Sequence, residues 1–100
     1  MDIFTPYGLD TTAVSVSATT ASGALNLPTA PMPSSVRLHN ATSVTVFVQF
    51  GGSTVEATTA NMPLPAGAVE IFEIGGGATH IAAITASGTG TLYATTGRGA

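Results

Sequence analysis

Residues 43–50 read Ser-Val-Thr-Val-Phe-Val-Gln-Phe, and this stretch decides the fold class. Apolar and polar side chains alternate along it, which is the pattern of a strand with one face on a core and the other toward solvent. The apolar face carries Val44, Val46, Val48 and Phe50. Most of these residues are β-branched or aromatic, which favours a strand over a helix. Phe47 is an unusual aromatic residue on the otherwise polar face of the predicted strand.

The same period of two continues on both sides of this stretch, interrupted by turn residues. The predicted strands are residues 12–19, 24–27, 35–40, 43–50, 54–57, 69–74, 79–85 and 90–95. Residues 22–23, 51–52, 75–77 and 87–88 contain glycine and are predicted turns. Residues 69–74 are apolar on both faces, so we expect that strand to be covered on two sides.

About eight short strands, with no stretch of ten residues in helical period, predict an all-β protein. We expect an antiparallel β-sandwich, for which a jelly roll is one arrangement, or a small barrel. Residues 1–11 form a predicted extended N-terminal arm, since Pro6 and Gly8 oppose regular structure. Residues 12–96 form the single sandwich domain, and residues 97–100 a flexible tail.

The chain is poor in charge: seven of its 100 residues are charged, none of them lysine, and the net charge is -3. Thr, Ser, Ala and Gly take the positions that charged residues usually occupy on a soluble domain. Such a surface allows many copies to pack together with little charge repulsion. A cysteine-free chain of this length also has a modest core, which contacts with neighbours would stabilise. We therefore expect a structural subunit of an assembly.

Composition also argues against several partners. Two cations, Arg37 and Arg98, are too few to neutralise a phosphate backbone, so no nucleic-acid binding is expected. No apolar run approaches the roughly 20 residues of a membrane-spanning helix. The N-terminal residues lack the basic and apolar segments of a signal peptide, so secretion through such a signal is not expected.

No group of residues predicts catalysis or a cofactor. The glycines at 75–77 and 88–90 lack the Lys-Ser/Thr ending and the following helix of a phosphate-binding loop. His39 and His80 lie in no nucleophile signature, and no pair of ligands two residues apart supports a metal site with Glu70 or Glu73. Glu70 and Glu73 are three residues apart on one strand, so they point to opposite faces. We expect no enzyme activity, cofactor or metal.

The candidate functional residues are interaction residues. The arm contains four apolar or aromatic side chains, more than a solvated tail carries: Ile3, Phe4, Tyr7 and Leu9. The arm either covers its own sandwich or reaches onto a neighbouring subunit. Phe47 either anchors a partner contact or is covered by a loop. The sequence leaves both alternatives open.

Four segments together resemble small virion proteins of tailed bacteriophages. They are Val-Arg-Leu-His-Asn at 36–40, the strand at 44–50 with Gly51, Ala-Thr-Thr-Ala-Asn-Met-Pro-Leu-Pro-Ala-Gly at 57–67, and Ser-Gly-Thr-Gly-Thr-Leu-Tyr at 87–93. The resemblance spans roughly residues 35–96 and brings no catalytic residues with it.

The resemblance implies a capsid decoration, or cement, protein on the outer surface of the virion. Such proteins bridge major capsid protein subunits, commonly as homotrimers, and are made in the host cytoplasm. The apolar arm would equally suit a neck, tail or fibre subunit, and a receptor- or carbohydrate-binding module is the alternative from another class. The absence of tryptophan is an argument against a sugar-binding platform.

Overall fold

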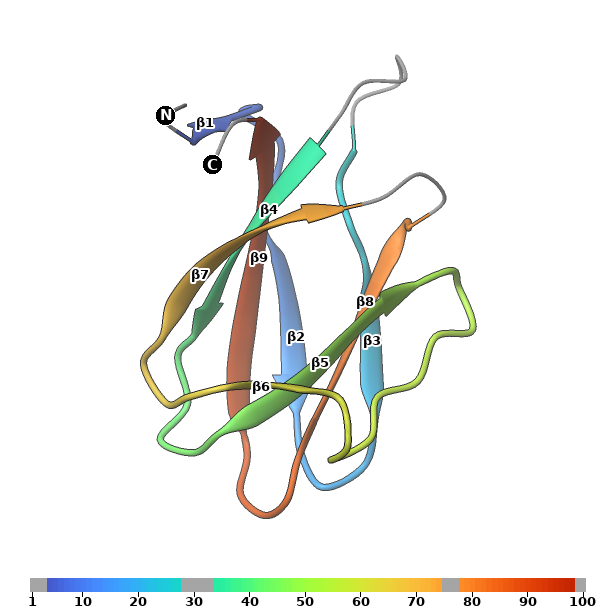
Figure 1. The fold of residues 1–100 in the computed structure, drawn as a ribbon, viewed down its shortest axis with the longest axis vertical. Coiled ribbons are helices and arrows are strands. Elements are labelled where there is room, and N and C mark those ends of the chain that lie inside the picture. The colour runs from blue at the N-terminus through green and yellow to red at the C-terminus, as the bar shows by residue number, and fades with distance from the viewer. Residues whose placement is uncertain (1–3, 28–33, 75–77, 99–100) are drawn as a thin grey trace.

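Two antiparallel sheets, built from nine strands, make up the part of the chain that the computed structural model describes, residues 4–27, 34–74 and 78–98 (Figure 1). No helix occurs among these residues. The strands are β1 (Thr5–Pro6), β2 (Thr12–Val16), β3 (Ala21–Ala24), β4 (Ser34–Asn40), β5 (Val46–Gly51), β6 (Met62–Leu64), β7 (Val69–Ile74), β8 (His80–Thr85) and β9 (Gly90–Arg98). The predicted all-β class is therefore confirmed.

The strand order defines the type of sandwich. The first sheet, which we call sheet A, has the order β1-β9-β4-β7, and β2 also pairs with β9. The second, sheet B, has the order β3-β8-β5-β6. From β2 to β9 the chain therefore places β2-β9-β4-β7 opposite β3-β8-β5-β6, which is the strand order of a jelly roll. The period-two pattern predicted the sandwich but not this order.

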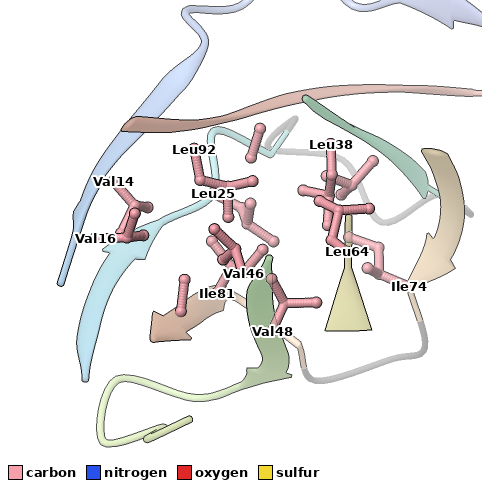
Figure 2. Packing of buried hydrophobic residues seen from close by; sticks show 13 residues of the cluster. Val14, Val16, Leu25, Leu38, Val46, Val48, Leu64, Ile74, Ile81 and Leu92 are labelled. Carbon is pink, nitrogen blue, oxygen red and sulfur yellow. The ribbon is translucent and has the colours of Figure 1, made fainter. Parts of the chain in front are cut away.

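The core lies between the two sheets and is filled by the inward half of each alternating strand (Figure 2). Val46 and Val48 are buried while Gln49 is exposed, as the predicted alternation requires, although β5 begins at Val46 and not at residue 43. The core side chains are Val14, Val16, Leu25, Val36, Leu38, Val46, Val48, Leu64, Ile74, Ile81, Ala83, Leu92 and Ala94. Val and Ile make up more than half of these side chains, and the tilted rings of Phe50 and Phe72 pack against them, so burial of apolar area stabilises the sandwich.

A buried polar cluster closes the end of the sandwich where β4 leads into β5. The Asn40 side chain has no solvent exposure, and its Nδ2 donates hydrogen bonds to the carbonyls of Val44 (2.9 Å), Leu64 (2.8 Å) and Pro65 (3.0 Å). Its Oδ1 accepts from the amide (2.9 Å) and hydroxyl (2.7 Å) of Thr42. One side chain thus joins the β4–β5 connection to the β6–β7 connection and satisfies their buried carbonyls.

Three local predictions were wrong. Ser22 and Gly23, the predicted turn, lie inside β3, where Gly23 allows close approach: a Cβ there would lie 2.9 Å from Thr12 Cγ2. The predicted strand at residues 54–57 does not form, and β6 forms at Met62–Leu64, where no strand was predicted. Gly23 was predicted as a turn residue, but in the structure its missing side chain allows β2 and β3 to pack closely.

The prediction that residues 69–74 are covered on two sides is also wrong. β7 is an edge strand of sheet A, and Val69 and Ile71 on its outer side are 45% and 37% exposed. An apolar run of this kind does not distinguish a central strand from an edge strand with one face open. At the other end of the chain, β9 continues past residue 95, so Gly97 and Arg98 of the predicted tail belong to the sheet.

Candidate interaction face

The outer face of sheet A, which is turned away from the core, presents apolar side chains to solvent. Strand pairing places Val69 of β7 opposite His39 of β4, and His39 opposite Tyr93 of β9. Tyr93 is 40% exposed and stands opposite Ala13 of β2, which is also exposed. The next row aligns Ile71, Arg37 and Thr95. We call this surface the open face; it consists of Ala13, Arg37, His39, Val69, Ile71 and Tyr93.

An aromatic pair lies in the middle of the open face. The rings of His39 and Tyr93 are stacked, with centroids 6.2 Å apart and planes inclined by 29°. Both positions point outward, because the residues flanking them on their strands, among them Leu38 and Leu92, are fully buried. Directly opposed side chains on neighbouring strands restrict each other's rotamers. The pair therefore forms a fixed, partly exposed platform across β4 and β9.

Arg37 is the one formal charge within the open face. It is half-buried, and its cross-strand neighbours, Ile71 and Thr95, are uncharged. No ion pair connects it to a carboxylate within the described ranges. Glu73 lies opposite Ser35 and Glu70 opposite Leu38, so the two glutamates belong to opposite faces of β7, as predicted.

The chain itself covers the middle of the outer face of sheet B, over β8, and leaves Ser22 of β3 and Gln49 of β5 exposed on either side. Residues 52–61, between β5 and β6, fold back over this sheet, and we call them the covering loop (Figure 1). One end contacts Gly51, where an added Cβ would lie 2.9 Å from Val55 Cγ2. Farther along, the buried Ala57 donates its amide to Thr20 Oγ1 (2.8 Å), next to β3. β8 runs between these two anchors, and its outward residue Ala82 has no solvent exposure.

Phe47, a predicted interaction residue, lies on the outer face of sheet B. It is half-buried, with Pro63 of β6 opposite it on one side and Ile84 of β8 on the other. The aromatic residue that stood out in the sequence therefore shares a face with the covering loop and is separated from the open face by the core.

The predicted arm residues lie along their own chain. Thr5 and Pro6 pair with Arg98 and Gly97, and the Phe4 ring lies against Gly97, 2.7 Å from where its Cβ would be. The Tyr7 amide donates to the carbonyl of Thr96 (3.1 Å). Of the two alternatives for the arm, the structure shows residues 4–7 on their own sandwich. Ile3 lies outside the described residues.

Beyond the pairing with β9, the arm borders a surface hollow of about 410 Å³. Leu9 is 41% exposed at its rim. The Asn26 side chain donates to the carbonyl of Asp10 (2.6 Å) and to Thr12 Oγ1 (3.4 Å), so its amide nitrogen is already bonded within the chain. The hollow is lined by Gly8, Leu9, Asp10, Leu25, Asn26 and Leu27.

The histidines do not form a common site. His39 lies on β4 of sheet A and His80 on β8 of sheet B, where its Nδ1 lies 2.8 Å from Thr79 Oγ1. Within residues 4–27, 34–74 and 78–98, no three His, Cys, Asp or Glu side chains are close enough to hold a metal ion. The described part of the chain also contains no helix able to cross a membrane.

Sequence reasoning did not identify the open face as a candidate site, because it treated β7 as covered. The two glutamates within residues 69–74 were the available signal, since charged residues commonly mark the edge strands of sheets. What the arrangement can do is bind a complementary surface through apolar contact, a stacked aromatic pair and one guanidinium group. Comparison of the chain with protein families, with curated proteins and with solved structures gave no match.

Proposed function

We propose that this protein is a structural virion protein that decorates the outside of a phage capsid and stabilises it by bridging major capsid protein subunits. The observation that carries the proposal is the difference between the two outer faces of the sandwich. The covering loop shields the middle of sheet B, whereas sheet A leaves Val69, Ile71 and Tyr93 exposed together. Adjacent exposed apolar side chains on one face are typical of protein contact surfaces.

The low charge of the chain supports the same role. With seven charged residues in 100, contacts between copies and a shell remove little ionic hydration, so burial of neutral surface is favourable over most of the molecule. The jelly roll is compatible with this role, since it occurs in viral capsid domains, but it also occurs in lectins and cupins and does not by itself assign a function. Among these, the resemblance to phage virion proteins supports the role in a viral particle.

The proposed partners are the major capsid protein and further copies of this chain, as a homotrimer. The chain would be made in the host cytoplasm and would assemble onto the shell there. This role needs no cofactor, nucleic acid or membrane. Repeated attachment through an oligomer increases binding beyond that of a single contact, because the second contact becomes intramolecular.

The alternative is a structural or receptor-binding module of the neck, tail or fibre. The stacked His39–Tyr93 pair supports this alternative, because an exposed aromatic platform on a sheet can also bind a saccharide ring. Copy number separates the two functions, because a shell has many equivalent positions and a tail has few.

The test is the stoichiometry of this chain in purified particles of the phage whose genome encodes it. Quantitative mass spectrometry against the major capsid protein should give hundreds of copies per particle for a decoration protein. A few to a few dozen copies would support the alternative instead. Complete absence of the chain from the particles would overturn both functions.

A further inference from the structure

We propose that the open face of sheet A binds a different protein, through an apolar surface that carries a carboxylate opposite Arg37, and not a second copy of this chain. The inference rests on the proposed function, in which that partner is a subunit of the capsid shell. It adds the location of the contact on this chain and the chemistry of the surface that meets it.

Arg37 lies where a partner on the open face would cover it. β4 lies between β7 and β9, so Arg37 stands in the interior of the open face, with Ile71 and Thr95 beside it and the His39–Tyr93 pair in the next row. A purely apolar partner would remove water from the guanidinium group and return no hydrogen bond, which is unfavourable. A carboxylate restores the lost interactions with two parallel N–H···O bonds, for which the planar guanidinium group is suited.

A second copy of this chain, centred on the same face, is an unfavourable partner. In a twofold dimer each subunit uses the same patch, so the side chains nearest the axis meet their own equivalents. A contact centred on the open face therefore brings two half-buried Arg37 groups together, and this like-charge contact is unfavourable.

Glu73, on the outer side of β7, does not rescue such a dimer. It lies in the row beyond Arg37, opposite Ser35, at the edge of the sheet. With strands about 4.8 Å apart, aligning Glu73 of one copy with Arg37 of another moves the axis to the corner of the face and carries Tyr93 past the edge of the other sheet. The apolar contact is then lost.

The size of the open face also limits what can bind there. The open face offers six residues on four strands. A stable isolated complex engages about 20–30 residues on each partner. The open face is thus too small for a lone dimer but adequate for a subunit that attaches to a lattice through several copies at once.

The experiment measures co-sedimentation of the purified full-length chain with shells assembled from the major capsid protein of the same genome. Arg37→Glu should weaken binding at least tenfold, and Arg37→Lys should weaken it less, because the charge remains. Arg98→Glu is the matched control: it makes the same change of charge at the chain's other cation, at the end of β9, and should change binding less than threefold. Tyr93→Ser should also weaken binding at least tenfold.

A cysteine footprint on the folded chain gives a second measurement that does not depend on charge variants. The chain contains no cysteine, so Ala13→Cys on the open face and Ser22→Cys on β3 of sheet B each introduce one exposed thiol. Shell binding should protect the thiol at position 13 from a maleimide at least tenfold, while the thiol at position 22 should label at the same rate with and without shells.

The outcomes separate the inference from the proposed function. Suppose that the wild type binds shells, that Arg37→Glu and Tyr93→Ser bind equally well, and that the thiol at position 13 is not protected. These results would overturn the inference and leave the decoration role standing. No shell binding by the wild type would overturn both. In sedimentation velocity without shells, a dimer that Tyr93→Ser dissociates would show that a second copy occupies the face. A host-surface polysaccharide that binds the wild type but not Tyr93→Ser, in the absence of shell binding, would show that the occupant is a glycan.

Discussion

The two outer faces of the sandwich differ in where the chain covers them: the covering loop crosses the middle of sheet B, whereas on sheet A the arm covers only the end of the face at Gly97. Both faces follow the same alternation, and each has an alanine on a strand where the alternation points it outward. Ala82 on β8 has no solvent exposure, whereas Ala13 on β2 is exposed. The difference arises from the covering loop, which is anchored at Gly51 and Thr20. The pattern of a strand therefore predicts which side chains leave the core, but the connections decide which of them reach solvent.

The largest expected effect comes from placing the same charge on each face. Ala82→Glu buries a carboxylate beneath the covering loop with no cation near it, and should lower the free energy of unfolding by about 3–5 kcal/mol or prevent folding. Ala13→Glu on the open face should change it by less than about 0.5 kcal/mol. Urea denaturation of the two variants measures both values. Equal losses would mean that the two faces are not differently covered.

The second comparison replaces an apolar residue by threonine on each face. Phe47→Thr removes a half-buried ring between Pro63 and Ile84 and should cost about 1.5 kcal/mol. Ile71→Thr, on the outer side of the edge strand, should cost less than about 0.5 kcal/mol, since threonine also suits a strand. Thermal unfolding monitored by circular dichroism gives the ranking. A larger loss for Ile71→Thr would contradict the assignment of the exposed face.

The third comparison tests the anchor of the covering loop. Thr20→Val removes the acceptor for the amide of Ala57, which is left unpaired in a buried position, and should cost about 1 kcal/mol. Thr95→Val removes an exposed hydroxyl that lies 2.9 Å from the Thr11 hydroxyl and should be close to neutral. Hydrogen exchange in Thr20→Val should accelerate in residues 52–61 first. Unchanged exchange there would show that Thr20 does not hold the loop.

The smallest expected effect is that of salt on attachment. The open face carries one formal charge, so raising sodium chloride from about 0.1 to 0.5 M should weaken shell binding by less than about threefold, because a desolvated ion pair is screened little. Co-sedimentation across the salt series measures this. Release of the protein by moderate salt would show that exposed charges elsewhere, and not the open face, make the contact.

The sequence predicted those strands whose buried and exposed faces show in the alternation of apolar and polar residues along the strand itself. Alternation around Val36 and Leu38 in β4, and around Val46 and Val48 in β5, identified their core faces, because a residue two positions away always lies on the same side. The contact between Thr20 and Ala57 joins residues 37 positions apart, and no local pattern contains it. The covering loop, and with it the contrast between the two faces, could therefore not be predicted.

The candidate site was predicted less well than the fold. Phe47 is an aromatic residue on a polar face and was predicted as an interaction residue, yet it lies on the face that the covering loop partly shields. Val69 and Ile71 were not predicted as interaction residues, because an apolar edge strand and an apolar central strand have the same sequence pattern. The position of β7 at the edge of sheet A is a property of the strand order, and the strand order follows from the packing of the whole chain.

The buried amide of Asn40 has a consequence for how the protein can be produced. Asn40-Ala41-Thr42 is an acceptor sequence for N-linked glycosylation, and the nitrogen that would carry the sugar is the one that bonds three carbonyls in the folded chain. A glycosyltransferase can reach it only before the sandwich closes, and a sugar attached then would keep that end from closing. Expression in a eukaryotic secretory pathway should therefore give a glycosylated, unfolded fraction that Asn40→Gln would not cure, because the longer side chain does not fit the same carbonyls.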